Sequence, residues 1–138
     1  MKSSRRKARI IALQSLYEID AVSHNPESVI KGQLEGKELS EENIRFAREL
    51  VNGVRDNKDK IDGYIKQFAS TWPVEQLSII DRNILRLAIF EILIDNKTPV
   101  KVAIDEAVEL SKMFGSDHSS KFVNGVLGSV STIATRDN

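Results

Sequence analysis

The sequence predicts an all-α protein of six or seven helices, and three observations support this prediction. Apolar residues recur at steps of three and four along most of the chain, a spacing that gathers them on one face of a helix. No segment of strand length shows the alternation of apolar and polar residues that a half-buried strand requires. The 138 residues include only seven glycines and three prolines, so few positions interrupt a helix. We expect residues 1–138 to form one domain.

The first predicted helix covers the basic start of the chain. Its apolar face consists of Ala8, Ile11, Ala12, Leu16 and Ile19. A short helix follows as far as Leu34, because Asn25 is a favoured N-cap residue and Pro26 suits the first helical position.

The next two predicted helices have signals at their ends. Ser40 is a favoured N-cap residue, and Glu41 and Glu42 complement the helix dipole in the first turn. The buried stripe of this helix is Ile44, Ala47, Val51 and Val54. A further helix carries Ile61, Ile65 and Phe68 on one face, and the pair Trp72-Pro73 interrupts the pattern.

Residues 77–94 form the most apolar segment, and their apolar side chains occupy most of the circumference of the predicted helix. We therefore expect a central helix that is packed on several sides. The segment is far longer than the ~4–8 residues of a typical strand. After a turn at residues 95–99, two last helices are expected, with apolar faces at Val100, Ala103, Ile104, Ala107, Val108 and Met113, and at Phe122, Val123, Val126, Val130 and Ile133.

Signatures of catalysis and of metal binding are missing from the sequence. Cysteine is absent, and His24 and His118 have no neighbours at metal-ligand spacing. The glycines form neither a phosphate loop nor a nucleophile elbow. Instead we expect Gly115 to end a helix in the left-handed conformation, and Gly125 and Gly128 to let two helices approach closely. We therefore expect no enzyme and no cofactor.

The apolar runs indicate no membrane helix. The longest runs reach only a few residues, far short of the ~20 that a spanning helix requires. Gln14 and Ser15 interrupt any signal-peptide core near the N-terminus. We expect a cytoplasmic protein.

Charge is balanced overall but not along the chain. The totals are 20 basic and 20 acidic residues, yet five basic residues and no acidic one precede Glu18: Lys2, Arg5, Arg6, Lys7 and Arg9. Four of them share one stripe of a helix, and cations in a first turn oppose the helix dipole. This arrangement suggests an external anion such as nucleic acid phosphate. A solvated basic face, a disordered end or an acidic protein partner would explain the same segment.

Aromatic residues could add base stacking to such a site. Tyr17 lies beyond the basic residues, and Phe114 and Phe122 flank a polar connection that includes Lys121. Each aromatic, taken alone, is explained as well by a place in the core. Stacking requires the Phe114–Phe122 connection to lie near the basic stripe.

Four segments together resemble the NusB family of bacterial transcription antitermination factors. They are RRKARIIALQSLYEID, VEQLSIIDRNILRLAIFEIL, TPVKVAIDEAVELSKMFG and SSKFVNGVLGSV, and they occur in the family's order over almost the whole chain. The resemblance implies two small helical subdomains packed together and no catalysis. It further implies binding of boxA, a short single-stranded RNA element, together with NusE, a protein of the small ribosomal subunit. The pair helps RNA polymerase, with other Nus factors, to read through terminators in ribosomal RNA operons.

Carried over by position, the resemblance assigns two surfaces. The RNA surface would contain the basic residues of the start, the three aromatics and the connection between the last two helices. Its residues are Lys2, Arg5, Arg6, Lys7, Arg9, Tyr17, Phe114, Ser119, Lys121 and Phe122. The NusE surface would contain Glu75, Asp81 and Arg82, whose acidic members suit a basic ribosomal protein.

Two alternatives accompany this interpretation. The same helical domain is similar to an N-terminal module of certain ribosomal RNA cytosine methyltransferases, but no catalytic domain follows here. A helical protein–protein adaptor, with a basic N-terminal contact surface, would also account for the pattern of charge.

Overall fold

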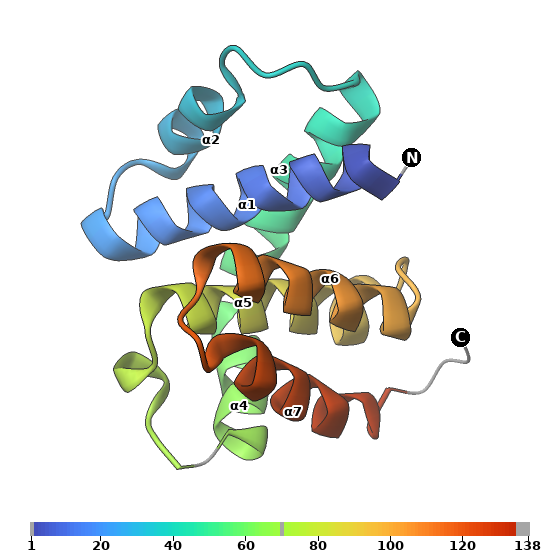
Figure 1. Ribbon diagram of the computed structural model, residues 1–138. Helices are drawn as coiled ribbons and strands as arrows, with labels where there is room; N and C mark the ends of the chain where they lie inside the picture. Colours follow the sequence, from blue (N-terminus) through green and yellow to red (C-terminus); the bar gives the residue numbers. More distant parts are fainter. Residues whose placement is uncertain (1, 70, 135–138) are drawn as a thin grey trace.

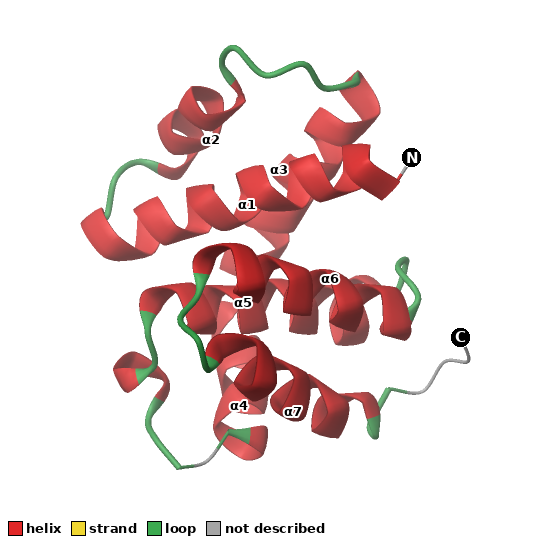
Figure 2. Cartoon of the chain, viewed as in Figure 1, coloured by secondary structure: helices red, strands yellow, loops and turns green. Residues whose placement is uncertain are grey.

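The computed structural model describes residues 2–69 and 71–134, with the side chains of residues 2 and 3 outside that description (Figure 1). Within these residues the chain is helical throughout and has no strand, as predicted (Figure 2). The α-helices are α1 (Lys2–Val22), α2 (Pro26–Leu34), α3 (Glu41–Asp56), α4 (Lys58–Phe68), α5 (Ile79–Ile89), α6 (Val100–Phe114) and α7 (Ser119–Ser131). A 3-10 turn, η1 (Val74–Gln76), precedes α5, and a π-helical segment, η2 (Phe90–Asp95), follows it.

The helix starts confirm the predicted caps. The Asn25 side chain accepts a hydrogen bond of 3.1 Å from the Ser28 N–H, and Pro26 is the first residue of α2. The Ser40 hydroxyl accepts a bond of 3.1 Å from the Asn43 N–H at the start of α3. These bonds satisfy backbone donors that have no partner inside a helix.

The helices form two groups, which contact each other mainly through α1 and α5 (Figure 1). One group holds α1, α2 and α3, and the other holds α4 to α7. Helix α5 packs against α1, α4, α6 and α7, so the predicted central helix is confirmed. Its core residues Ile84, Leu85 and Ile89 are completely buried.

The central segment changes its winding after Ile89, which the sequence analysis did not predict. Residues of η2 follow a π-helix, and Asn96 then adopts the left-handed conformation at φ 61°. The wider turn brings the Phe90 ring onto Gly53 of α3, where a Cβ atom would overlap the ring. It also carries Glu91 into the buried interior.

The glycine predictions near the C-terminus are wrong. Gly115 has a φ of −92° and a ψ of −173°, which is extended rather than left-handed. A side chain is excluded there because a Cβ atom would collide with Ser119 and lie 2.7 Å from the Ser111 carbonyl oxygen. Gly125 and Gly128 are exposed and have no atom within 4 Å of a Cβ position, so no close helix approach depends on them.

The contact between Gly53 and Phe90 generates a prediction about stability. Gly53→Ala should lower the free energy of unfolding by ~1–3 kcal/mol, because the buried Phe90 ring must move to admit a methyl group. Gly63→Ala is the matched control, since Gly63 lies in α4 with open space around it. The control should leave stability unchanged or raise it by up to ~1 kcal/mol through helix propensity. Urea denaturation measures both, and equal effects would contradict the close packing of α3 on η2.

Candidate nucleic-acid interface

The three arginines of the basic stripe, Arg5, Arg6 and Arg9, each contact a carboxylate of the protein. The Arg5 guanidinium lies 4.1 Å from the centre of the Phe46 ring on α3. It donates hydrogen bonds to Asn43 Oδ1 at 3.2 Å and to Glu42 Oε1 at 3.4 Å. About two fifths of its side chain remains exposed, beside a cleft between the α1 start, α3 and the 95–99 turn. Arg5 is thus partly available to a ligand.

Arg6 forms a bidentate pair with Glu106 of α6. Its Nε donates to Glu106 Oε1 at 3.1 Å, and its Nη2 donates to Oε2 at 2.7 Å. The Glu106 side chain is 2% exposed, whereas the Arg6 side chain is 31% exposed. Hydrogen bonding to Glu106, and then its charge, raise the pKa of Arg6.

Arg9, which the family resemblance assigns to the RNA surface, is buried. Only 6% of its side chain is exposed. Its Nε and Nη2 donate to the two carboxylate oxygens of Glu91, each at 2.9 Å, and its Nη1 lies 3.7 Å from Glu106. The Thr98 hydroxyl donates a further bond of 2.8 Å to Glu91. This guanidinium holds α1 against η2 and cannot meet a phosphate without leaving the interior.

The predicted stripe therefore exists, but its anions come from the protein. Glu42, Glu91 and Glu106 offset the charges that we expected nucleic acid to offset. Lys7 lies on another side of α1 than Arg5, because a step of two residues along a helix is a rotation of more than half a turn. It is exposed, and no carboxylate in the described part of the chain pairs with it. The Lys2 side chain lies outside the described residues.

Two of the three aromatic residues of the prediction, Tyr17 and Phe114, line one cavity. Tyr17 is 41% exposed, and with Phe114 it lines a cavity of about 420 Å³ between α1 and the end of α6. Gln14 lines this cavity and also a second one, of about 300 Å³, that includes Lys7. Lys7, Gln14 and Tyr17 thus lie along one exposed face of α1. Phe122 is half-buried on α7.

Residues of α1, α6 and α7 line a polar groove. This groove, of about 540 Å³, is lined by Arg6, three acidic and two further basic residues, and polar or apolar side chains: Asp105, Glu106, Val108, Glu109, Lys112, Ser120, Lys121 and Asn124. Lys121 is exposed there. Acidic and basic residues are equal in number, so the groove is not a basic surface.

Ser119 is a structural residue and not a surface contact. It is buried, and its hydroxyl accepts a hydrogen bond of 2.9 Å from the Ser116 N–H. The bond orders the turn that leads from Gly115 into α7. The family resemblance assigns this buried residue to the RNA surface.

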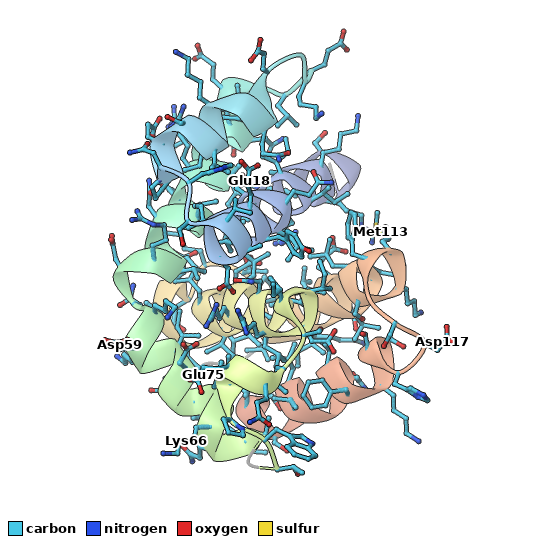
Figure 3. The ribbon with its side chains drawn as sticks, turned by 90° about the vertical axis from the view of Figure 1, so that its left-hand side faces the viewer. Glu18, Asp59, Lys66, Glu75, Met113 and Asp117 are labelled. Carbon is cyan, nitrogen blue, oxygen red and sulfur yellow. The ribbon has the colours of Figure 1, made fainter. Side chains whose placement is uncertain are left out.

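The residues assigned to a protein partner lie at the opposite end of the central helix from η2. Glu75 is exposed in η1, and Figure 3 shows it on the other side of the view from Met113 and Asp117. Asp81 is half-buried in the first turn of α5. Arg82 donates two hydrogen bonds of 2.8 Å to the Asp20 carboxylate and one of 3.1 Å to the Glu75 carbonyl. Its guanidinium is therefore engaged within the protein.

Asp20 is the centre of a second, partly buried charge cluster. Asn83 and Arg86 donate hydrogen bonds of 2.9 Å and 3.0 Å to Asp20 Oδ2. Arg86 also forms a bidentate pair with Asp62 of α4. Burial alone would raise the pKa of Asp20. Hydrogen bonds from Arg82 and Asn83, and the charges of Arg82 and Arg86, outweigh it and lower the pKa to about 2.

Comparison with known proteins identifies the fold and its family. The family model of the NusB family matches residues 6–132. The chain belongs to the NusB family. The transcription antitermination protein NusB of Dehalococcoides mccartyi is 60% identical over 131 residues, which are 95% of this chain and 92% of that protein. Its counterpart in a Roseiflexus species is 51% identical over 132 residues, with coverage of 94% and 93%.

Solved NusB structures share the arrangement of helices. The T. maritima NusB structure superimposes with a TM-score of 0.88 at 31% identity, covering 96% of this chain and 93% of that one. A crystal structure of the antitermination factors NusB and NusE in complex with dsRNA gives a TM-score of 0.87 at 27% identity, with coverage of 96% and 98%. The all-helical NusB fold is thus confirmed.

The described part of the NusB-family chain shows neither a membrane-spanning helix nor a cluster of metal ligands. Along residues 2–69 and 71–134, no helix combines the length and the apolar character needed to cross a membrane. The same residues contain no group of three His, Asp or Glu side chains that could hold a metal ion.

Sequence reasoning missed the carboxylates that pair with α1. Glu106 lies one turn from Ala103 and from Leu110 on the buried face of α6, and Glu91 lies between Phe90 and Ile92. A charged residue on an apolar helix face is rarely buried without a partner. Their positions were thus a signal that a cation from elsewhere in the NusB-family chain would bind there.

The Asp20 cluster predicts a pH dependence of stability. The folded-state pKa of about 2 is below the ordinary value of 3.8. Ionised Asp20 therefore stabilises the fold above pH 3.8, and this contribution is lost as the pH falls toward 2. Asp20→Asn should be less stable at neutral pH and should lose less stability on acidification over this range. Unfolding at a series of pH values measures it.

The control for this experiment is Asp59→Asn, because Asp59 is an exposed carboxylate on α4 (Figure 3). It should retain the steep acid dependence of the unchanged protein. If Asp20→Asn retained that dependence too, the Asp20 cluster would not carry the effect.

Proposed function

We propose that this chain is a transcription antitermination factor that binds a boxA-type single-stranded RNA together with NusE. In this role it promotes read-through of ribosomal RNA operons by RNA polymerase, within a complex that includes other Nus factors. The observation that carries the proposal is the match of 96% of the chain to a NusB solved with NusE and RNA. The role is non-catalytic and uses no cofactor, and its place is the cytoplasm, where RNA polymerase works.

The proposed RNA surface follows the exposed face of α1 toward the α6–α7 connection. Lys7 offers a charge for a phosphate, and Tyr17 and Phe114 offer faces for stacking at one cavity. Lys121 and Phe122 extend the surface along α7. Arg5, on the other side of α1, contacts RNA only if the strand passes around the helix start. Arg9 and Ser119 support this surface from within, and Arg6 is paired with Glu106 at its edge.

The proposed NusE surface lies around η1 and the start of α5. Glu75 is exposed, and Asp81 has one shielded carboxylate oxygen without a hydrogen-bond partner among the described residues. Both carboxylates suit a basic protein. Arg82 donates hydrogen bonds to Asp20 and to the Glu75 carbonyl, and it thereby holds η1 against α5.

The internal pairing of the arginines gives the adaptor alternative a specific observation in its favour. A cation that is already neutralised attracts phosphate less strongly, so the stripe alone does not require nucleic acid. An adaptor would bind any RNA weakly and without sequence discrimination. The two functions therefore differ in a measurable ratio of affinities.

Filter binding with a boxA-type RNA and a scrambled RNA of equal length tests the proposed function. The protein should bind the boxA-type RNA more tightly, and Tyr17→Ala should weaken this binding by ~1–3 kcal/mol, the range for loss of one base stack. Lys60→Gln is the control, since this exposed lysine lies on α4, outside the proposed RNA surface. Equal and weak affinity for both RNAs would favour the adaptor.

Cooperation between RNA and NusE provides a second test. If NusE completes the RNA surface, NusE should raise RNA affinity, and RNA must raise NusE affinity by the same factor. Glu75→Lys should weaken NusE binding while leaving RNA binding by the isolated protein unchanged. Calorimetry in both orders of addition measures the coupling. Independent binding would contradict the shared surface but not either single interaction.

A further inference from the structure

Two buried glutamates each hold one arginine of α1, but the two arginines differ in their access to solvent. Glu91 and Glu106 are both 2% exposed, and each makes a bidentate pair. The Arg9 side chain is 6% exposed, whereas that of Arg6 is 31% exposed. One pair is therefore entirely internal, and the other reaches the surface.

Arg6 reaches the surface beside the proposed RNA site. It lines the polar groove together with Lys121 and Asn124 of α7 and Lys112 of α6. A strand that follows α1 toward the α6–α7 connection would pass this groove. The Nε and Nη2 edge of Arg6, which could chelate a phosphate, is occupied by the Glu106 carboxylate.

Glu106 cannot easily release this arginine. Its carboxylate is removed from water, and loss of a partner from a buried pair is strongly destabilising. Arg9 does not substitute fully, because its own bidentate edge is directed to Glu91. A phosphate on the surface would therefore have to compete with this buried carboxylate for Arg6.

The consequence concerns specificity. Contacts to phosphates supply the sequence-independent part of nucleic-acid affinity, whereas stacking and hydrogen bonds to bases supply the discrimination. A neutralised arginine at the edge of the site lowers the contribution of phosphate contacts and leaves the contribution of base contacts unchanged. It thus increases the ratio of specific to non-specific binding.

We propose that Glu106 is a specificity-determining residue, which neutralises Arg6 and so keeps one additional phosphate contact out of RNA binding. The inference rests on the proposed RNA-binding function and deepens it. Glu106 acts through Arg6 and does not touch RNA.

Glu106→Gln tests the inference, with Glu91→Gln as the matched control. Both substitutions remove one buried negative charge of equal exposure, but only the first releases an arginine at the surface. For scrambled RNA, the log–log salt slope of Glu106→Gln should become steeper by about 0.7, the value of one contact to a single strand. Its affinity should then fall about 2.6-fold more than that of the unchanged protein between 50 and 200 mM salt. Glu91→Gln should keep the original slope.

The affinity ratio between boxA-type and scrambled RNA should fall in Glu106→Gln and not in Glu91→Gln. The double variant Arg6→Gln/Glu106→Gln should return to the original slope, because neither residue of the pair contacts phosphate. Circular dichroism will show whether Glu106→Gln folds. If it does not fold, the salt slope of the double variant is compared with that of the unchanged protein. Lys7→Gln, which removes a proposed contact, should flatten the slope by about 0.7.

Three results would overturn the inference. A slope of Glu106→Gln equal to that of the unchanged protein would show that Arg6 gains no phosphate. Weaker binding of both RNAs by folded Glu106→Gln would show that the pair positions Arg6 for RNA. A flatter slope in the double variant would show that Arg6 already binds phosphate. Failure of the unchanged protein to bind any RNA would instead contradict the proposed function itself, and the inference with it.

Discussion

The buried carboxylates of Glu91 and Glu106 constrain the placement of the N-terminal helix. A carboxylate removed from water destabilises a protein unless a cation and hydrogen bonds compensate it. Here α1 brings the compensating groups, Arg6 and Arg9, to η2 and α6. Apolar contacts alone would tolerate a small shift of α1 along its axis. Two bidentate pairs do not, because each requires two N–H···O bonds in one plane.

A second cluster holds the other end of the same helix. Asp20 accepts hydrogen bonds from Arg82, Asn83 and Arg86, all on α5. Helix α1 has 21 residues, so charged contacts fasten it at points separated by several turns. This attachment joins the two groups of helices and also fixes the rotation of α1. With the arginine face inward, the face with Lys7 and Tyr17 is left for solvent and for ligands.

The sequence predicted the helices, the caps of α2 and α3 and the central place of α5, because these features depend on spacing and on local hydrogen bonds. It predicted the grouping of Tyr17 with Phe114 only through the family resemblance, since that contact joins residues far apart in the chain. The sequence did not reveal that carboxylates of the protein itself pair with the arginines of the basic stripe, and the reason is physical. A spacing of three and four places Arg5 and Arg9 on one face, but it does not reveal whether that face meets water or a carboxylate such as Glu91. The π-helical turn at η2, which brings Glu91 inward, has no simple sequence signal.

The arrangement changes how the charge of the N-terminal segment should be understood. Five basic residues before Glu18 would suggest a phosphate-binding arm, yet the pairs Arg6–Glu106 and Arg9–Glu91 have no net charge. Attraction at a distance decreases when opposite charges are this close, so this part of α1 contributes little to long-range steering. Recognition must then depend more on contacts at short range, where an exposed ring such as Tyr17 can stack on a base. A helix that is basic in sequence thus becomes a rigid and nearly neutral support for a discriminating surface.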